Sequence, residues 1–227
     1  MRVISPMAAR AVIFDCDGVL VDSERLITQV ESEHLKRLGL ELSPEEARAW
    51  FMGLTVTDTA ARIQQRLGGT LSPEWLHDWG MWAALALTRS LRAVPGVTAV
   101  VEHLHRNEVP ICVASQSPLP RVQLSLEVTG LAQYFGGRVF TASMVGRPKP
   151  APDLFLYAAE QIGIDARSCV VVEDSPSGTA AAVAAGMDVL GYAADSDADR
   201  LAAAGAKLFR AMEEVPELLR RRGLCAF

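Results

Sequence analysis

Two aspartates, Asp15 and Asp17, come directly after a short apolar run and are followed by Gly18. The apolar run, Val12-Ile13-Phe14, has the composition of a buried β-strand. Carboxylates at the end of a buried strand are costly unless a cation or a reaction requires them. The carboxyl ends of parallel strands are also where open α/β sheets bind their ligands. The pattern therefore predicts a site for metal binding, nucleophilic chemistry or acid–base chemistry at this position.

A calcium-binding loop is a second interpretation of an Asp-x-Asp-Gly sequence. That loop requires glycine at its sixth position and glutamate at its twelfth. Counted from Asp15, these positions hold Leu20 and Leu26, which excludes the calcium loop. On this motif alone, a solvated polar turn remains an alternative.

Three later segments also place a polar side chain after an apolar run or in a stiff loop. Ser115 ends the run Ile111-Cys112-Val113-Ala114, and Lys149 lies between Pro148 and Pro150. The acidic pair Glu173-Asp174 follows Val170-Val171-Val172. Each segment alone is weak evidence, because a serine after a strand is often a helix cap and most lysines are exposed. The order of all four segments is the informative feature.

Taken together, the four segments resemble the haloacid dehalogenase superfamily of phosphohydrolases, in the branch of β-phosphoglucomutase and small sugar-phosphate phosphatases. The first motif of that family, Asp-x-Asp-x-[Val/Thr]-[Leu/Ile], matches Asp15 to Leu20, and the resemblance covers nearly the whole chain. It implies an α/β fold, a Rossmann-like doubly wound parallel sheet core with an inserted all-helical cap domain. It also implies a phosphoric monoester hydrolase that works through an aspartyl-phosphate intermediate.

The resemblance implies catalytic roles for four residues. Asp15 would be the nucleophile, and Asp17 would be the general acid and base that serves the leaving group and the water. Ser115 would donate a hydrogen bond to the phosphate, and Lys149 would neutralise the transferring group. The dehalogenase members lack the second aspartate, so Asp17 argues against carbon–halogen cleavage.

The implied cofactor is Mg²⁺, which prefers oxygen ligands and is often held by one or two carboxylates together with substrate phosphate. The resemblance places four acidic residues at the metal: Asp15, Asp17 through its main-chain carbonyl, Asp174, and Glu173 in or near the surrounding layer. The main-chain amides of Asp17, Gly18 and Gln116 would complete the phosphate cradle, because loop amides after a strand point at an anion.

Alternation of strands and helices in most of the chain predicts a parallel sheet covered on both faces. We expect strands near residues 10–15, 110–115, 137–140, 168–173, 187–191 and 207–209, with helices near 96–107, 118–129, 152–163, 177–185, 197–204 and 213–222. Residues 22–91 break this alternation and predict only helices, near 22–38, 44–51, 56–67 and 72–90. The expected organisation is a core domain of residues 1–21 and 92–227 and a cap domain of residues 22–91.

The loop between the second and third expected cap helices is a candidate for substrate recognition. In relatives the equivalent loop descends onto the active site, which implies substrate contacts for Gly53, Leu54 and Thr55. An ordinary helix–helix turn with core aromatic residues is the alternative for this segment.

Phosphatase and mutase activities differ in what the cap must hold. β-Phosphoglucomutases carry a histidine where this chain has Ile27, and a Lys-Gly-x-Ser-Arg cap loop where this chain has Met52-Gly53-Leu54-Thr55-Val56. After the second motif they carry Lys and Asn, where this chain has Pro118 and Leu119. Without these cations, we expect simple hydrolysis of a small phosphorylated sugar or sugar acid. A phosphosugar mutase and a non-catalytic phosphosugar-binding protein remain alternatives.

The amino-acid composition limits which other classes of protein this chain can belong to. The chain has 227 residues, of which 50% are hydrophobic and 22% charged, and a net charge of −5. No basic cluster predicts nucleic-acid binding, and no apolar run reaches the roughly 20 residues of a membrane span. The four cysteines lack metal-binding spacing, which is typical of reduced core cysteines in a cytoplasmic protein. We expect a monomer whose partner is a small phosphorylated metabolite.

Overall fold

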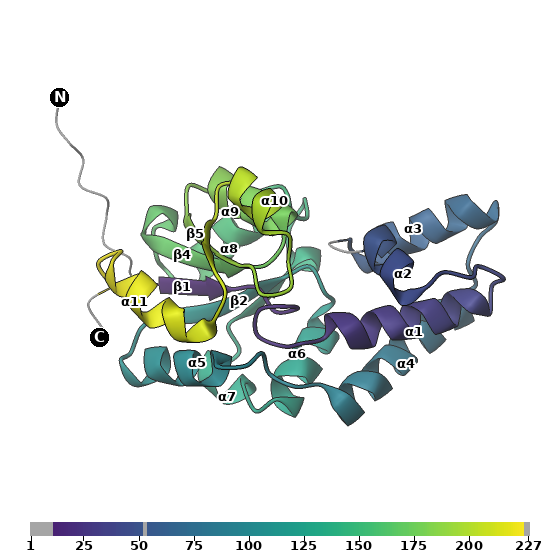
Figure 1. Cartoon of the computed structure of the whole chain (residues 1–227), viewed down its shortest axis with the longest axis horizontal. Helices are drawn as coiled ribbons and strands as arrows, with labels where there is room; N and C mark the ends of the chain where they lie inside the picture. Colours follow the sequence, from purple (N-terminus) through teal and green to yellow (C-terminus); the bar gives the residue numbers. More distant parts are fainter. Residues whose placement is uncertain (1–10, 52–53, 225–227) are drawn as a thin grey trace.

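The computed structural model describes residues 11–51 and 54–224, and its centre is one six-stranded parallel sheet (Figure 1). The strand order is β3-β2-β1-β4-β5-β6. The order reverses between β1 and β4, which is the switch point where such sheets bind ligands. The strands are β1 (Ala11–Phe14), β2 (Ile111–Ser115), β3 (Val139–Thr141), β4 (Cys169–Glu173), β5 (Asp188–Tyr192) and β6 (Lys207–Phe209).

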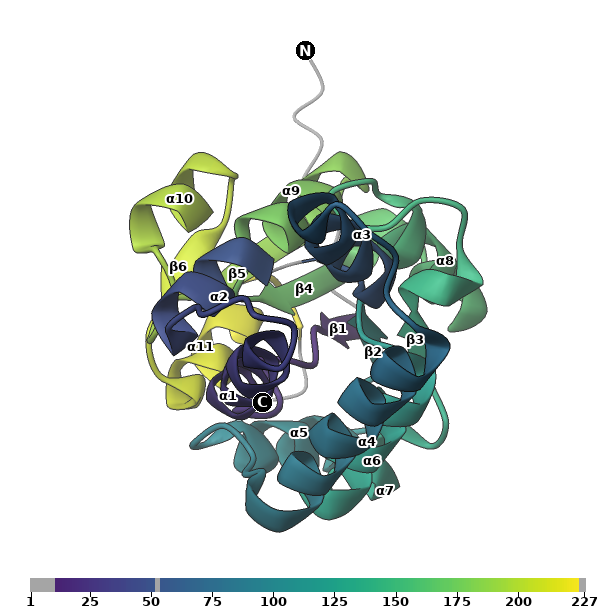
Figure 2. The same ribbon diagram turned by 90° about the vertical axis from the view of Figure 1, so that its right-hand side faces the viewer.

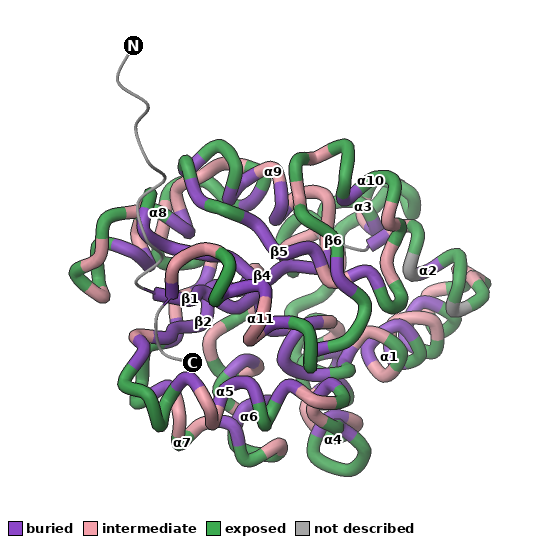
Figure 3. Tube along the Cα trace, turned by 60° about the vertical axis from the view of Figure 1, so that its left-hand side comes forward, coloured by how far each residue is buried: buried purple, intermediate pink, exposed green. Residues whose placement is uncertain are grey.

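Alternate residues of the central strand serve two separate hydrophobic layers. Val12 and Phe14 pack with one layer, whereas Ala11 and Ile13 pack with the other, and all four are fully buried. The first layer is built from α5 (Val97–Arg106), α6 (Leu119–Val128), α7 (Ala132–Phe135) and α11 (Val215–Arg220). The second layer is built from α8 (Asp153–Gln161) and α9 (Pro176–Ala184), and α10 (Ala198–Ala203) lies beside α9 and β6. Figure 3 shows the buried strands enclosed by helices with exposed outer faces.

Four further helices lie beyond the end of the sheet toward which β1 points (Figures 1 and 2). We call this segment the helical insert: α1 (Glu24–Lys36), α2 (Pro44–Phe51), α3 (Val56–Leu67) and α4 (Pro73–Ser90). Leu35, Ala47, Phe51 and Ile63 form a small core within it. Its long helix α4 packs against both α1 and α6, so the insert also contacts the sheet domain.

The two chain segments that join the insert to the sheet lie side by side. The amide of Asp22 donates to the carbonyl of Arg92 at 3.0 Å, and the amide of Val94 donates to the carbonyl of Leu20 at 3.0 Å. A short antiparallel bridge between Val21 and Ala93 completes this pairing. The insert therefore leaves and re-enters the sheet domain at one place.

The predicted fold class is confirmed, and every predicted strand is found within two residues of its expected bounds. The sequence pattern did not predict α7 or the 3₁₀ turns η1 (Ala142–Met144) and η2 (Ala166–Ser168), and the helix expected near 213–222 begins as a third 3₁₀ turn, η3 (Met212–Glu214). These elements are three or four residues long, too short for a helical period to be visible. Within residues 11–51 and 54–224, no helix combines the length and apolarity needed to span a membrane.

Candidate active site

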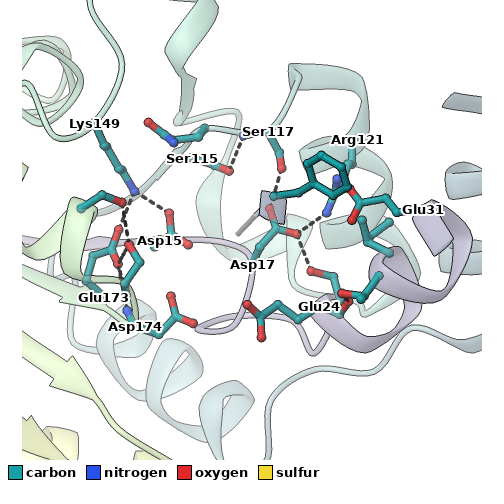
Figure 4. Close-up of a pocket in the computed structure, with 17 residues that line it drawn as sticks. Asp15, Asp17, Glu24, Glu31, Ser115, Ser117, Arg121, Lys149, Glu173 and Asp174 are labelled. Carbon is teal, nitrogen blue, oxygen red and sulfur yellow. Dashed lines mark hydrogen bonds and ion pairs between the residues drawn. The ribbon is translucent and has the colours of Figure 1, made fainter. Parts of the chain in front are cut away.

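A buried lysine joins two carboxylates at the carboxyl ends of β1 and β4 (Figure 4). Lys149 Nζ lies 2.6 Å from Asp15 Oδ1 and 2.7 Å from Glu173 Oε1, and it donates to the carbonyl of Ala114 at 3.1 Å. The amide of Asp15 donates to the carbonyl of Val172 at 2.9 Å, which fixes this residue beside β4. Residues from β1, β2, β4 and the loop after β3 thus meet at the switch point of the sheet.

The carboxylates here outnumber the positive charges beside them. Burial raises the pKa of Asp15 to about 7, although the Lys149 ammonium opposes this shift. Burial and the neighbouring charges of Glu173 and Asp15 hold the pKa of Asp174 well above its usual range. Burial alone would lower the pKa of Lys149, but the two carboxylates outweigh it and raise this pKa. One ammonium therefore faces three carboxylates, so a further cation would be electrostatically stabilised at this site.

The oxygen-only donor set fits Mg²⁺. Mg²⁺ is usually held by one or two carboxylates, with water and substrate phosphate as its other ligands. Within residues 11–51 and 54–224, no three acidic, histidine or cysteine side chains are arranged as a complete metal-ligand cluster, so a bound ion would need other oxygen ligands as well. Gly18 has φ +84°, and a Cβ on it would lie 2.1 Å from Asp174 Oδ2, so the main chain of the Asp17–Gly18 loop passes close to this carboxylate. Asp15, Asp174 and this loop are the groups best placed to hold the ion.

Both carboxylate oxygens of Glu173 accept hydrogen bonds from other groups of the protein. Its Oε2 accepts hydrogen bonds from the amides of Asp174 and Ser175 at 2.9 and 2.8 Å, and from Ser175 Oγ at 2.9 Å. Its other oxygen contacts Lys149. The carboxylate lies against the first turn of α9, where a Cβ on Gly178 would be 1.6 Å from Glu173 Oε1. These contacts fix Glu173 beside Lys149, and its place in or near the layer around the metal stays a prediction.

Replacing Gly178 by alanine should lower the free energy of unfolding by about 1–3 kcal/mol, because the added methyl group must displace the buried Glu173 carboxylate. Gly80 is the matched control: it lies inside α4 with open space around its Cα. Gly80→Ala should raise the free energy of unfolding by about 0.5–1 kcal/mol through helix propensity. Urea unfolding of both variants measures the contrast, and a Gly178→Ala variant as stable as the wild type would contradict the close packing.

Asp17 lies across the cavity from Lys149 and has three side-chain partners of its own (Figure 4). Its carboxylate accepts hydrogen bonds from Ser23 Oγ, from Ser117 Oγ at 2.6 Å and from Arg121 Nη2 at 3.0 Å. Burial acts to raise the pKa of Asp17, but the Arg121 charge and the hydroxyl hydrogen bonds outweigh it, so the pKa is lowered. In this arrangement Asp17 is held as a carboxylate, the form that accepts a proton.

A cavity of about 140 Å³ lies between the sheet edge and the helical insert. Its sheet side is lined by Asp15, Asp17, Ser115, Gln116, Ser117, Arg121, Lys149, Glu173, Asp174, Ser175 and Ser177. Ser115 is buried, and its Oγ accepts a hydrogen bond from the amide of Ser117 at 3.1 Å. The insert contributes Ser23, Glu24, Ile27, Thr28, Glu31 and Phe51.

Two residues of the loop predicted to recognise substrate, Leu54 and Thr55, lie away from the cavity. Leu54 packs into the small core of the insert, and Thr55 accepts the amide of Asp58 at 3.1 Å as the N-cap of α3. Neither residue lines the cavity, because packing and helix capping use both side chains; Phe51 from the end of α2 reaches the cavity instead. Gly53, the third residue of this prediction, lies outside the described residues.

Sequence reasoning missed several residues that line the cavity. Ser23, Ser117 and Arg121 bind Asp17 but belong to no recognisable spacing pattern in the sequence. Glu24 and Glu31 did carry a signal, because with Ile27 and Thr28 they recur at intervals of three and four on one face of α1. A helix face that mixes acidic and apolar residues in this way differs from a purely packed face.

The family model of haloacid dehalogenase-like hydrolases matches residues 9–186. Among curated relatives, 6-phosphogluconate phosphatase of Escherichia coli strain K12 is 29% identical, over 94% of this chain and 96% of its own length. Hexitol phosphatase A of the same organism is 30% identical, over 86% of this chain and 88% of its own. A Deinococcus radiodurans HAD family hydrolase, solved with bound phosphate and sodium, has a TM-score of 0.77 and 34% identity, and the match covers 95% of this chain and 97% of that one.

The chain therefore belongs to the haloacid dehalogenase-like hydrolases, which confirms the predicted family. The two curated relatives are named as phosphatases, in agreement with the predicted enzyme class.

Proposed function

We propose that this protein is a Mg²⁺-dependent phosphatase that hydrolyses a small phosphorylated sugar or sugar acid through an aspartyl-phosphate intermediate. The observation that carries the proposal is the cavity with Asp15 and Lys149 at one end and Asp17 beside them, toward the helical insert. A nucleophile, a fixed positive charge and a proton carrier are the three groups that phosphate monoester hydrolysis requires. The names of the curated relatives and the bound phosphate of the Deinococcus structure support the same chemistry.

In the first half-reaction, a carboxylate oxygen of Asp15 attacks phosphorus and the bond to the leaving alcohol oxygen breaks. Substrate binding must first loosen the hydrogen bonds that hold Asp17 ionised, so that Asp17 takes up a proton from solvent and then donates it to that oxygen. In the second half-reaction, Asp17 takes a proton from water, which attacks phosphorus and releases Asp15 and inorganic phosphate. Lys149 neutralises the transferring group in both steps, and bound Mg²⁺ would supply Lewis-acid charge neutralisation beside Asp15 and Asp174.

We further propose that residues 22–91 act as a cap domain on a core of residues 1–21 and 92–227. The paired connections at residues 20–22 and 92–94 support this division, because the insert is joined to the sheet domain at that one place. A lid of this kind excludes water from a reactive phospho-enzyme and selects the substrate. The monomeric state and cytoplasmic location stay predictions.

Phosphate release from a panel of sugar phosphates, with Mg²⁺ and with chelator, tests the proposed activity. We expect turnover with Mg²⁺, loss to background with chelator and full recovery when Mg²⁺ is restored, because the carboxylate-rich site needs a divalent cation. Thermal unfolding gives a second readout: Mg²⁺ should raise the Tm of the wild type but not of Asp174→Asn.

Three results would contradict this proposal. Turnover that persists in chelator would remove the metal from the mechanism. Conversion of β-glucose 1-phosphate to glucose 6-phosphate without phosphate release would favour the mutase. Stabilisation by a sugar phosphate without any turnover would favour a binding protein.

A further inference from the structure

The insert side of the cavity carries acidic groups where a substrate's leaving group must lie. Glu24, Ile27, Thr28 and Glu31 follow one face of α1 and line the cavity opposite the sheet edge. In Figure 4, Arg121 lies between Asp17 and Glu31, at the end of the cavity remote from Lys149. The phosphoryl group belongs at the Lys149 end, so these helix residues face the rest of the substrate.

The positive charges of the cavity are already balanced. Among its described lining residues, the bases are Lys149 and Arg121. Lys149 is bound between Asp15 and Glu173, and Arg121 donates to Asp17 at 3.0 Å. Glu31 also interacts electrostatically with Arg121, and burial raises the pKa of Glu31 to about 7 because this charge only partly offsets desolvation. A second anionic group on the substrate would meet Glu31 and Glu24 and no base without a carboxylate partner.

A hydroxyl group suits the same surroundings. The buried Arg121 Nε has no hydrogen-bond partner among the described residues, and the Glu31 carboxylate beside it accepts hydrogen bonds. A hydroxyl both accepts and donates, so one hydroxyl or a neighbouring pair can satisfy both groups. A carboxylate or phosphate only accepts when ionised, so it can satisfy Arg121, but above pH 7 it is repelled by Glu31, which is then ionised.

We propose that Glu31 makes this cavity selective for a phosphomonoester whose remote end is an uncharged polyhydroxyl chain, and that it rejects substrates ending in a carboxylate or a second phosphate. The inference rests on the proposed phosphatase function and narrows its substrate class to neutral sugar or sugar-alcohol phosphates. The repulsive group is the discriminating element, as in other sites that exclude a close analogue by an unfavourable charge.

A matched substrate pair tests the proposal directly. Sorbitol 6-phosphate and 6-phosphogluconate share a six-carbon polyhydroxyl chain and differ at C1, which is a hydroxymethyl group in the first and a carboxylate in the second. At about pH 8.5, where a Glu31 carboxyl with a pKa of about 7 is ionised, we expect wild-type kcat/KM to favour sorbitol 6-phosphate by about tenfold or more, the effect of one like-charge contact at a partly buried site. p-Nitrophenyl phosphate, which offers no remote hydroxyl or carboxylate, serves as the reference substrate for the chemistry itself.

Glu31→Gln keeps the shape of the side chain and removes its charge. We expect it to reduce the sorbitol 6-phosphate preference about tenfold, mainly by raising kcat/KM for 6-phosphogluconate, with little change for p-nitrophenyl phosphate. Glu33→Gln is the control, since Glu33 lies on the same helix but is exposed and does not line the cavity. Its substrate ratio should equal that of the wild type.

The outcomes separate the two proposals. Wild-type preference for 6-phosphogluconate, together with turnover of p-nitrophenyl phosphate, would overturn the selectivity and leave the phosphatase function standing. An unchanged ratio in a folded Glu31→Gln variant would overturn the role of Glu31. Absence of phosphate release from all three compounds would overturn the phosphatase function, and the selectivity with it. The wild-type comparison decides the substrate class even if Glu31→Gln does not fold.

Discussion

Asp15→Asn should abolish phosphate release while the protein stays folded. An amide cannot form the acyl phosphate, and removal of an activated nucleophile costs about 10⁴-fold or more in kcat/KM. The free energy of unfolding should stay within about 1 kcal/mol of the wild type, because asparagine has the same shape and can still hydrogen-bond to Lys149. Lys149 also keeps Glu173 as its charged partner at 2.7 Å.

Two measurements check this result: phosphate release under saturating Mg²⁺, and urea unfolding of the same preparation. Asp78→Asn is the matched control, because Asp78 is exposed on α4 of the insert and does not line the cavity. It should leave both quantities unchanged. Loss of a nucleophile should leave far less than about 1% of wild-type kcat/KM. If Asp15→Asn keeps more activity than this, another group is the nucleophile.

Lys149→Met should damage stability and activity together. The ammonium is 2% exposed and lies between two buried carboxylates, so its loss leaves Asp15 and Glu173 without compensation. Removing one partner of a buried ion pair typically costs about 3–5 kcal/mol of unfolding free energy. Activity should fall by about 10²–10³-fold or more, because a preorganised positive charge on the transferring group is also lost.

A double variant separates these two effects. Glu173→Gln removes the excess negative charge in the Lys149→Met background and should restore about 1–3 kcal/mol of stability, the usual range for coupled neighbours. It should not restore phosphate release, because no cation is returned to the site. Urea unfolding and phosphate release of the single and double variants form the complete cycle. Recovery of activity along with stability would show that Lys149 acts only as a structural ion-pair partner.

The strands and the order of the chemical groups could be read from the sequence because both depend on local patterns. A continuous apolar run such as Cys169–Val172 predicts a strand buried on both faces, and Asp174 after it falls at the ligand-binding end of a parallel sheet. The family motifs then identified which of these polar groups are candidates for catalysis. The meeting of Asp15 and Glu173 at the β1–β4 switch point follows directly from that topology, whereas Lys149 reaches them from the loop after the edge strand β3.

The surroundings of Asp17 could not be read in the same way. Arg121 is 104 positions away along the chain, and its guanidinium reaches Asp17 only because α6 begins just after β2, the strand beside β1. The places of Leu54 and Thr55 could not be read from the sequence either: Leu54 packs in the insert core and Thr55 caps α3, so their predicted contact with substrate stays a prediction.

By itself, the sequence determined the sheet and the helical insert, because apolar periodicity and strand ends are properties of neighbouring residues. The four groups of catalytic candidates came from the resemblance to a known family. Only the tertiary structure decided which side chains of α1 face the cavity and which charges balance one another there. Those features depend on distances between segments that are remote in the sequence, and electrostatic interactions between such segments change with these distances.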